Sequence, residues 1–123
     1  MHNTDEFKNI LTEDLEKIIH ELKIIAVHNP HTDDWVAVPP EDFQSADSNI
    51  TADAAEEWST RRAMMTQLET RYKNITRALQ KIAAGTYGVC ETCQQPIEPA
   101  RLAMNPAART DIIHSADESQ LPL

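Results

Sequence analysis

Both cysteines of the chain lie in residues 85–114, which read GTYGVCETCQQPIEPARLAMNPAARTDIIH. Two thiolates separated by two residues can hold one face of a zinc ion from a tight turn, and a tetrahedral site then needs two further ligands. Seventeen residues separate Cys93 from Asp111, and two more separate Asp111 from His114. The pattern predicts a metal site made by Cys90, Cys93, Asp111 and His114, with a carboxylate and an imidazole in place of a second cysteine pair.

Two other interpretations of the cysteine pair remain open. The motif could be a metal-free remnant, held together by aliphatic packing of Ile97, Leu102, Ile112 and Ile113. It could also be a redox-active dithiol, although no thioredoxin-like βαβ pattern surrounds it. A structural zinc site is the favoured interpretation. A catalytic zinc is not expected, because such a site keeps an open position and a nearby general base, and the sequence offers no such base.

The composition limits the possible partners. The chain of 123 residues is long enough for one domain, and 20 acidic against 11 basic residues give it a formal net charge of −9. Such a chain is a poor candidate for binding bare nucleic acid, but it could dock on a basic protein surface. The polar N-terminus does not resemble a signal peptide. Together with the low cysteine content, this favours the reducing cytoplasm.

Two apolar stripes predict two long helices. The first helix is expected over about 4–27, and the second over about 53–84, where Gly85 supplies a stop signal. The predicted stripes are Leu11, Leu15, Ile18, Leu22 and Ile25 in the first, and Met65, Leu68, Tyr72, Ile75, Leu79 and Ile82 in the second. Because a single narrow stripe cannot bury itself, the pattern predicts an antiparallel two-helix coiled-coil hairpin over 1–84, in a mostly α protein.

The connection between the helices is acidic and rich in proline. Residues 28–52 are expected to form a long loop, with at most a short extended piece at 35–38. Trp35 and Phe43 are expected to be exposed there. Residues 85–116 would then form the metal-binding module, and residues 117–123 a frayed tail.

The module resembles a known family. The run ALQKI at 78–82, followed by GTYGVCETC and PIEPARLAMNPAART, is similar to the zinc finger of the DksA/TraR family. The resemblance covers about residues 75–116 and implies a cytoplasmic, non-enzymatic, zinc-binding regulator of transcription. Such a protein binds RNA polymerase by inserting its coiled coil into the secondary channel. Gln94 departs from the family pattern, which usually has glycine there, where the turn favours a positive φ.

The resemblance also implies a working tip at the end of the coiled coil, with an Asp-x-x-Asp-x-Ala motif. Asp53 and Ala55 match its second half, whereas Ile50 stands where the first aspartate is expected. Asp47 is the nearest preceding acid. The alternative function, from another class, is a small structural-zinc module that uses its hairpin to bind a partner other than polymerase. The sequence leaves the oligomeric state open.

Overall fold

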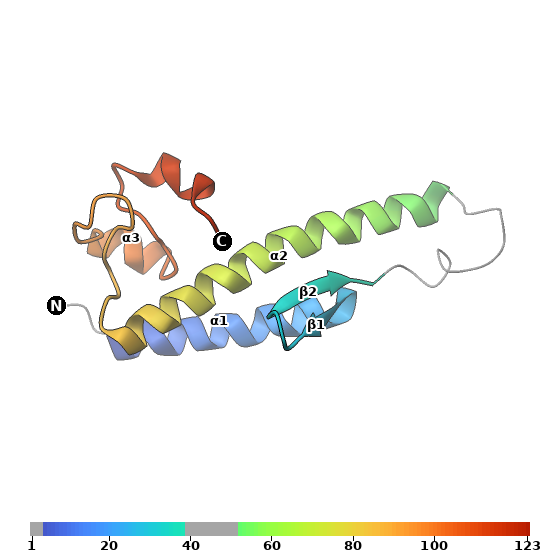
Figure 1. The fold of residues 1–123 in the computed structure, drawn as a ribbon, viewed down its shortest axis with the longest axis horizontal. Coiled ribbons are helices and arrows are strands. Elements are labelled where there is room, and N and C mark those ends of the chain that lie inside the picture. Colours follow the sequence, from blue (N-terminus) through green and yellow to red (C-terminus); the bar gives the residue numbers. More distant parts are fainter. Residues whose placement is uncertain (1–3, 39–51) are drawn as a thin grey trace. The chain divides into compact units, whose positions relative to one another are not determined.

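The computed structural model describes residues 4–38 and 52–123. In chain order, the elements are helix α1 (Thr4–Ile25), strands β1 (Ala26–Asn29) and β2 (Asp34–Ala37), helix α2 (Ala52–Ala84), short helix α3 (Pro99–Met104) and 3-10 helix η2 (Ser115–Gln120) (Figure 1). Within the described residues, no helix is both long enough and apolar enough to cross a membrane.

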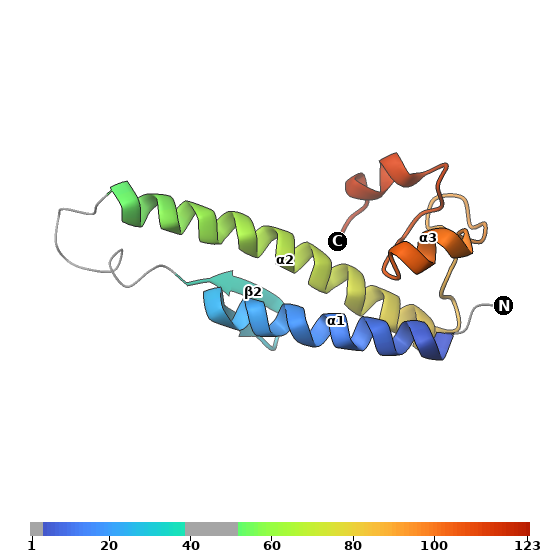
Figure 2. The same cartoon turned by 180° about the vertical axis from the view of Figure 1, so that it is seen from behind.

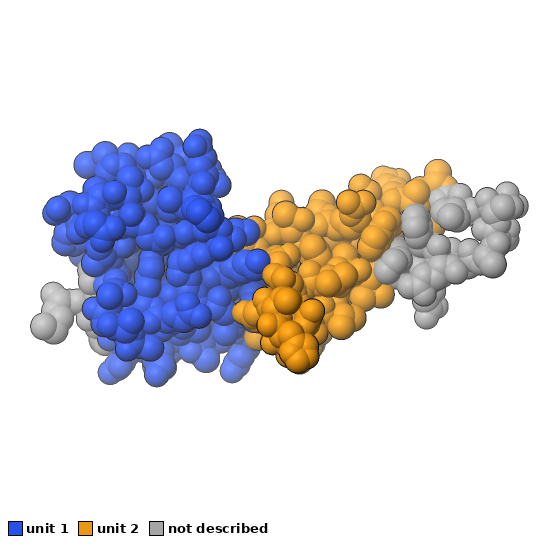
Figure 3. Space-filling view, in the orientation of Figure 1, with its two compact units in different colours: residues 1–17, 72–123 blue, residues 18–71 orange. Residues whose placement is uncertain are grey.

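The chain divides into two compact units, each described by itself. The first contains residues 1–17 and 72–123, and the second contains residues 18–71 (Figure 3). Both long helices contribute to both units. In each unit, the segments of α1 and α2 run side by side in opposite directions (Figures 1 and 2). The predicted fold class, a helical hairpin with a small C-terminal module, is therefore confirmed.

The core of the second unit combines both helices with the hairpin β1–β2. The strands are antiparallel, and Ala26 pairs with Ala37 at the open end of the ladder. The Trp35 ring lies 4.8 Å from that of His28, measured between centroids, and is 5% exposed. Among the described residues of this unit, the buried apolar side chains are those of Ile18, Leu22, Ile25, Ala26, Trp35, Ala54 and Leu68.

The β-hairpin corrects three expectations. The first helix ends at Ile25, two residues before its predicted end, and much of the first part of the predicted loop is a strand pair. Proline disfavours the helical conformation in the residue before it, so Pro30 favours an extended chain at Asn29. Trp35 is buried and not exposed as predicted, because β2 packs its side chain inward. Phe43 lies outside the described residues.

In the first unit, the helix ends pack beneath the C-terminal module. Leu11 from α1 and Tyr72, Ile75 and Ala78 from α2 are buried there. The rings of Phe7 and Tyr87 lie 5.5 Å apart, measured between centroids. The predicted apolar stripes thus supply core residues in both units. The C-terminal end of α2 leads directly into the cysteine module.

Candidate metal centre

The cysteine module begins where α2 ends in a Schellman turn. Gly85 has φ 77° and donates its backbone N–H to Ile82 O at 3.2 Å, while Thr86 N donates to Lys81 O at 2.9 Å. This pair of bonds satisfies carbonyls that the helix end would otherwise leave without partners. The left-handed conformation costs least at glycine. The expected stop at Gly85 therefore has a local physical cause.

A tight turn then presents the two thiols. Cys90 N donates to Gln95 O at 2.8 Å, and Gln94 N donates to Cys90 O at 2.9 Å. Gln94 has φ 63°, the left-handed conformation expected at the position where the DksA/TraR pattern usually has glycine. Cys90 is fully buried, whereas Cys93 is partly exposed. Both thiols are free.

The segment that carries Asp111 is fixed from several sides. Arg101, on α3, donates from Nε to Thr110 O at 2.6 Å. Arg109 donates to Glu91, which lies between the cysteines, at 2.7 Å from Nε and 2.9 Å from Nη2. Thr110 and Asp111 are both buried. These contacts bring the second predicted ligand pair next to the first.

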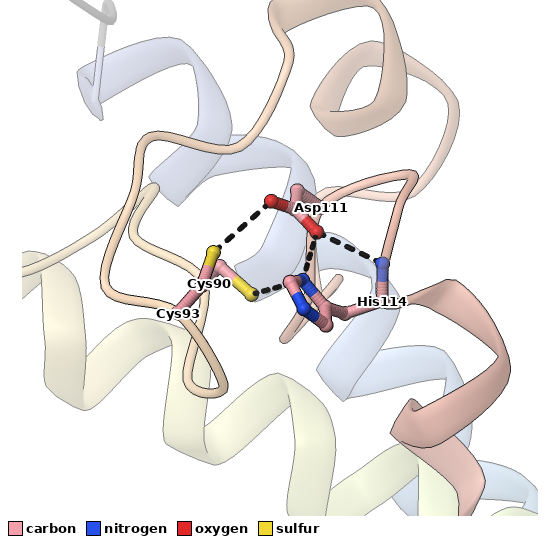
Figure 4. Close-up of side chains that lie close together, drawn as sticks. All are labelled: Cys90, Cys93, Asp111 and His114. Atoms are coloured by element: carbon pink, nitrogen blue, oxygen red, sulfur yellow. Dashed lines mark hydrogen bonds and ion pairs between the residues drawn. The ribbon is translucent and has the colours of Figure 1, made fainter.

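The four predicted ligands converge (Figure 4). The Cys93 thiol donates to Asp111 Oδ2 at 3.2 Å, and Cys90 Sγ lies 3.9 Å from His114 Nδ1. One ligand atom can be chosen from each residue so that all four lie within 4.8 Å of one another. Around a tetrahedral zinc with bonds of roughly 2.0–2.3 Å, neighbouring ligand atoms are about 3.3–3.8 Å apart. The arrangement therefore fits an ion of this kind, with two sulfurs, one nitrogen and one oxygen as donors.

Hydrogen bonding within the cluster shifts the pKa values of its members. Burial alone would raise the pKa of Asp111, but hydrogen bonds from Cys93 and His114 outweigh burial and lower it. The hydrogen bond to Asp111, 2.8 Å between Oδ1 and Nδ1, raises the pKa of His114. Burial also acts to raise the pKa of Cys90, yet hydrogen bonds from the backbone of neighbouring residues lower it overall. A thiol with a lowered pKa is a better metal ligand, because the thiolate is the binding form.

Cys93 differs from Cys90. A hydrogen bond from the backbone of Gln95 acts to lower the pKa of Cys93. Burial and the neighbouring Asp111 carboxylate act in the opposite direction and prevail, so this pKa is raised overall. The two thiols of one C-x-x-C turn thus differ in their readiness to ionise.

Two residues named for the metal-free interpretation do not pack as that interpretation requires. Ile97 and Leu102 are buried, as expected, but Ile112 is 57% exposed and Ile113 is 82% exposed. Both lie in the short loop between Asp111 and His114, which turns their side chains to solvent. Aliphatic packing therefore comes from only half of the four residues proposed for it.

The charged residues around the site were not predicted as functional. Glu91, Arg101, Arg109 and Glu118 form ion pairs or hydrogen bonds around the segment that carries Asp111. Charged residues at such separations have no periodic pattern in the sequence. One feature of the sequence could have indicated these contacts. Arg109 lies two residues before Asp111, and a charged residue so close to a buried ligand needs a partner of its own.

The structure describes only some of the predicted tip residues. Asp53 and Ala55 lie in the first turn of α2, and both are exposed. Asp47 and Ile50 lie outside the described residues. The acidic side chain of Asp53 is therefore accessible to solvent, and its part in binding stays a prediction.

Comparison with known families agrees with the sequence. Residues 85–110 match the family model described as the prokaryotic dksA/traR C4-type zinc finger. The chain carries a DksA/TraR-type zinc finger. The match includes Cys90 and Cys93 and ends one residue before Asp111. Asp111 and His114, which replace the second cysteine pair of a four-cysteine module, lie beyond the matched residues. No significant match was found among curated proteins.

Solved structures share the fold of the chain. The transcription factor DksA2 from Pseudomonas aeruginosa has a TM-score of 0.65 and 18% sequence identity, over 94% of this chain and 82% of its own. The DnaK suppressor protein from Agrobacterium tumefaciens C58 has a TM-score of 0.54 and 22% identity, over 94% of both chains. At such identities the likeness concerns the fold, which includes both the helical hairpin and the DksA/TraR-type module.

Proposed function

We propose that the chain is a zinc-binding regulator of transcription that acts by binding RNA polymerase, with no catalytic activity of its own. The match of residues 85–110 to the DksA/TraR zinc finger carries this proposal. The fold shared with a transcription factor supports it. The net charge of −9 favours a basic protein surface over bare nucleic acid as the binding partner.

The zinc would be held by Cys90, Cys93, Asp111 and His114. Their convergence within 4.8 Å and the mixed sulfur, nitrogen and oxygen donors support this assignment. When bound, the ion would supply a structural cross-link between the turn at residues 90–93 and the segment at 111–114. A site of four protein ligands leaves no open position for an activated water, which agrees with a structural role.

The polymerase contact would be made by the acidic residues near the start of α2, namely Asp53 with Ala55, together with Asp47. Asp53 is exposed in the first turn of α2. An exposed carboxylate is suited to a basic channel, because binding there would neutralise its charge.

The direct test is co-purification with bacterial core RNA polymerase at low salt. Asp53→Asn should weaken this binding. Asp5→Asn is a matched control, because Asp5 is also an exposed acid in the first turn of a long helix, α1. Both changes remove one charge near a helix N-terminus, so their effects on helix stability should be similar. Equal binding by wild type and Asp53→Asn would remove Asp53 from the contact.

A second candidate is a structural-zinc module that binds a different partner through its hairpin. Trp35 no longer supports it, because this side chain is buried. A pocket of about 320 Å³ in the second unit favours it instead, since Ile24 and Met64 line the pocket and are exposed. Failure of polymerase to co-purify at low salt would favour this candidate. Ile24→Ser should weaken binding of the chain to its partner only if this second candidate is correct.

A further inference from the structure

The segment that carries the second ligand pair is held by side chains that are not themselves ligands. Glu98 Oε2 accepts a hydrogen bond from Ile112 N at 3.0 Å, directly after Asp111. Arg101 holds Thr110, directly before Asp111, through both the carbonyl at 2.6 Å and the hydroxyl at 3.2 Å. The backbone on both sides of Asp111 is therefore fixed by two charged side chains, Arg101 on α3 and Glu98 directly before α3.

Glu118 completes this arrangement from the other side of His114. One of its carboxylate oxygens, Oε1, accepts a hydrogen bond from Arg109 N. The other, Oε2, forms an ion pair with Arg101 Nη2 at 3.4 Å. Glu118 lies on η2, whose N-cap residue is His114. A single carboxylate thus joins the helix that follows His114 to the backbone that precedes Asp111.

The result is a closed loop from Arg109 to Glu118 that contains both Asp111 and His114. Arg109 is 4% exposed with Glu118 in place, so its backbone N–H relies on the Glu118 carboxylate for a hydrogen-bond partner. An unpaired buried donor is costly, and the segment would be expected to shift to find another partner. Because Asp111 is two residues from Arg109, such a shift would move a ligand atom.

We propose that Glu118 is a positioning residue for the metal centre, which acts by closing this loop around Asp111 and His114. The inference rests on the metal binding proposed above. Groups that orient metal ligands without touching the ion typically contribute about 10-fold to 100-fold to affinity. Glu118 lies eight residues beyond the part of the chain that matches the zinc-finger family model.

The test is titration of the full-length chain with Co²⁺, which reports on a tetrahedral site through its absorption spectrum, followed by competition with Zn²⁺. Glu118→Ala should weaken Co²⁺ binding about 10-fold or more and alter the ligand-field bands. Glu118→Gln should have a smaller effect, because its amide oxygen can still accept from Arg109 N while the charge facing Arg101 is lost. Asp117→Ala is the matched control, since Asp117 is an exposed acid on the same helix.

The ligand-field bands separate positioning from general stability. A residue that merely stabilises the fold would lower the melting temperature but leave the Co²⁺ spectrum of the folded protein unchanged. Folding of each variant is checked by circular dichroism, and Glu118→Gln carries the test if Glu118→Ala does not fold. A folded Glu118 variant with the Co²⁺ affinity and spectrum of the wild type would overturn this inference and leave the proposed metal site standing. Absence of Co²⁺ and Zn²⁺ uptake by the wild type would overturn the proposed metal site and this inference with it.

Discussion

Glu91 accepts two hydrogen bonds from the guanidinium of Arg109, at 2.7 Å from Nε and 2.9 Å from Nη2. Lys81, in the last turn of α2, adds a third contact from Nζ at 2.8 Å. Glu91 lies between the two cysteines, and Arg109 lies two residues before Asp111. The pair therefore connects the turn that carries one half of the proposed metal site to the segment that carries the other.

Glu91→Gln should destabilise the chain by about 2 kcal/mol, because it leaves the buried Arg109 guanidinium without its counterion. Chemical denaturation of the zinc-loaded protein measures this loss. The control is Glu57→Gln, which breaks the exposed pair of Glu57 with Arg61 at 2.9 Å on α2. That change should cost about 0.5 kcal/mol or less. Equal losses for the two variants would contradict the importance assigned to Glu91.

The same pair should give a pH dependence of known sign. The hydrogen bond from Arg109 is the largest cause that lowers the pKa of Glu91, to about 2 from an ordinary value of 4.5. A carboxyl whose pKa is lowered by folding stabilises the folded state above its ordinary pKa, and this stability is lost as the pH falls towards the folded value. The difference in unfolding free energy between wild type and Glu91→Gln should therefore shrink below about pH 4.5.

The purified chain should contain about one zinc ion, and Cys90→Ser should lower both the zinc content and the melting temperature. Loss of one thiolate removes a quarter of the ligand set, and structural zinc contributes directly to folding. Metal analysis of protein prepared without chelator measures the content. Thr92→Ala is the control, because this exposed residue lies between the thiols and leaves both in place. A wild-type protein that is folded and free of zinc would refute the assignment.

Replacing Asp111 should separate its role as a ligand from that of its neighbours. Asp111→Ala should weaken zinc binding, whereas Asp111→Cys should strengthen it, because thiolate is a softer donor that zinc binds well. Competition with a chromophoric chelator measures both affinities. If Asp111→Ala binds zinc as tightly as the wild type, Asp111 is not a ligand, and water or another group completes the site.

Gln94→Gly should stabilise the module by about 0.5–1 kcal/mol. Gln94 has φ 63°, a conformation that costs an ordinary residue roughly 1–2 kcal/mol and costs glycine little. The gain is reduced because glycine also loses more backbone entropy on folding. Gln95→Gly is the matched control, since Gln95 is the adjacent exposed glutamine without a positive φ. Thermal unfolding should show opposite changes for the two variants, and destabilisation by Gln94→Gly would count against strain at this turn.

Tyr87 should make stability sensitive to high pH. Its hydroxyl donates to Pro106 O at 2.7 Å, and burial raises the pKa of Tyr87 to about 12 from an ordinary value of 10. A raised pKa means that the neutral phenol stabilises the folded state fully below about pH 10, and that this stability is lost as the pH rises towards 12. Tyr87→Phe should cost about 1 kcal/mol near pH 8, and the difference from the wild type should shrink above pH 10. A difference that is constant from pH 8 to 11.5 would show that the hydroxyl ionises without cost.

The sequence predicted the helices well because their cores repeat at the helical period. Leu11, Ile18 and Leu22 were placed on the apolar stripe of α1, and all three are buried. The stop at Gly85 was also predicted correctly, since it depends on the conformational freedom of one residue. Such signals are local, and nearby residues suffice to determine them.

The hairpin β1–β2 and the ion pairs of the module depend on contacts that local patterns do not contain. Trp35 belongs to a strand of four residues, too short for a clear alternating pattern that would indicate its burial. Glu118 meets Arg109 nine residues away, across a turn made by residues that were themselves predicted as ligands. The predicted ligands came together because their spacing follows a recurring turn, whereas their supporting charges follow none.

The proposed mixed ligand set has a consequence for oxidation. Cys90 and Cys93 are the only thiols in the chain, so oxidation within one molecule can produce a single disulfide, confined to one turn. A module with four thiols could form six different pairs, including bridges that cross-link its two halves. Here the second half is held by a carboxylate, an imidazole and ion pairs, which an oxidant that attacks thiols leaves unchanged. Reduction of one bond is then enough to restore every ligand, with no mispaired product to be sorted.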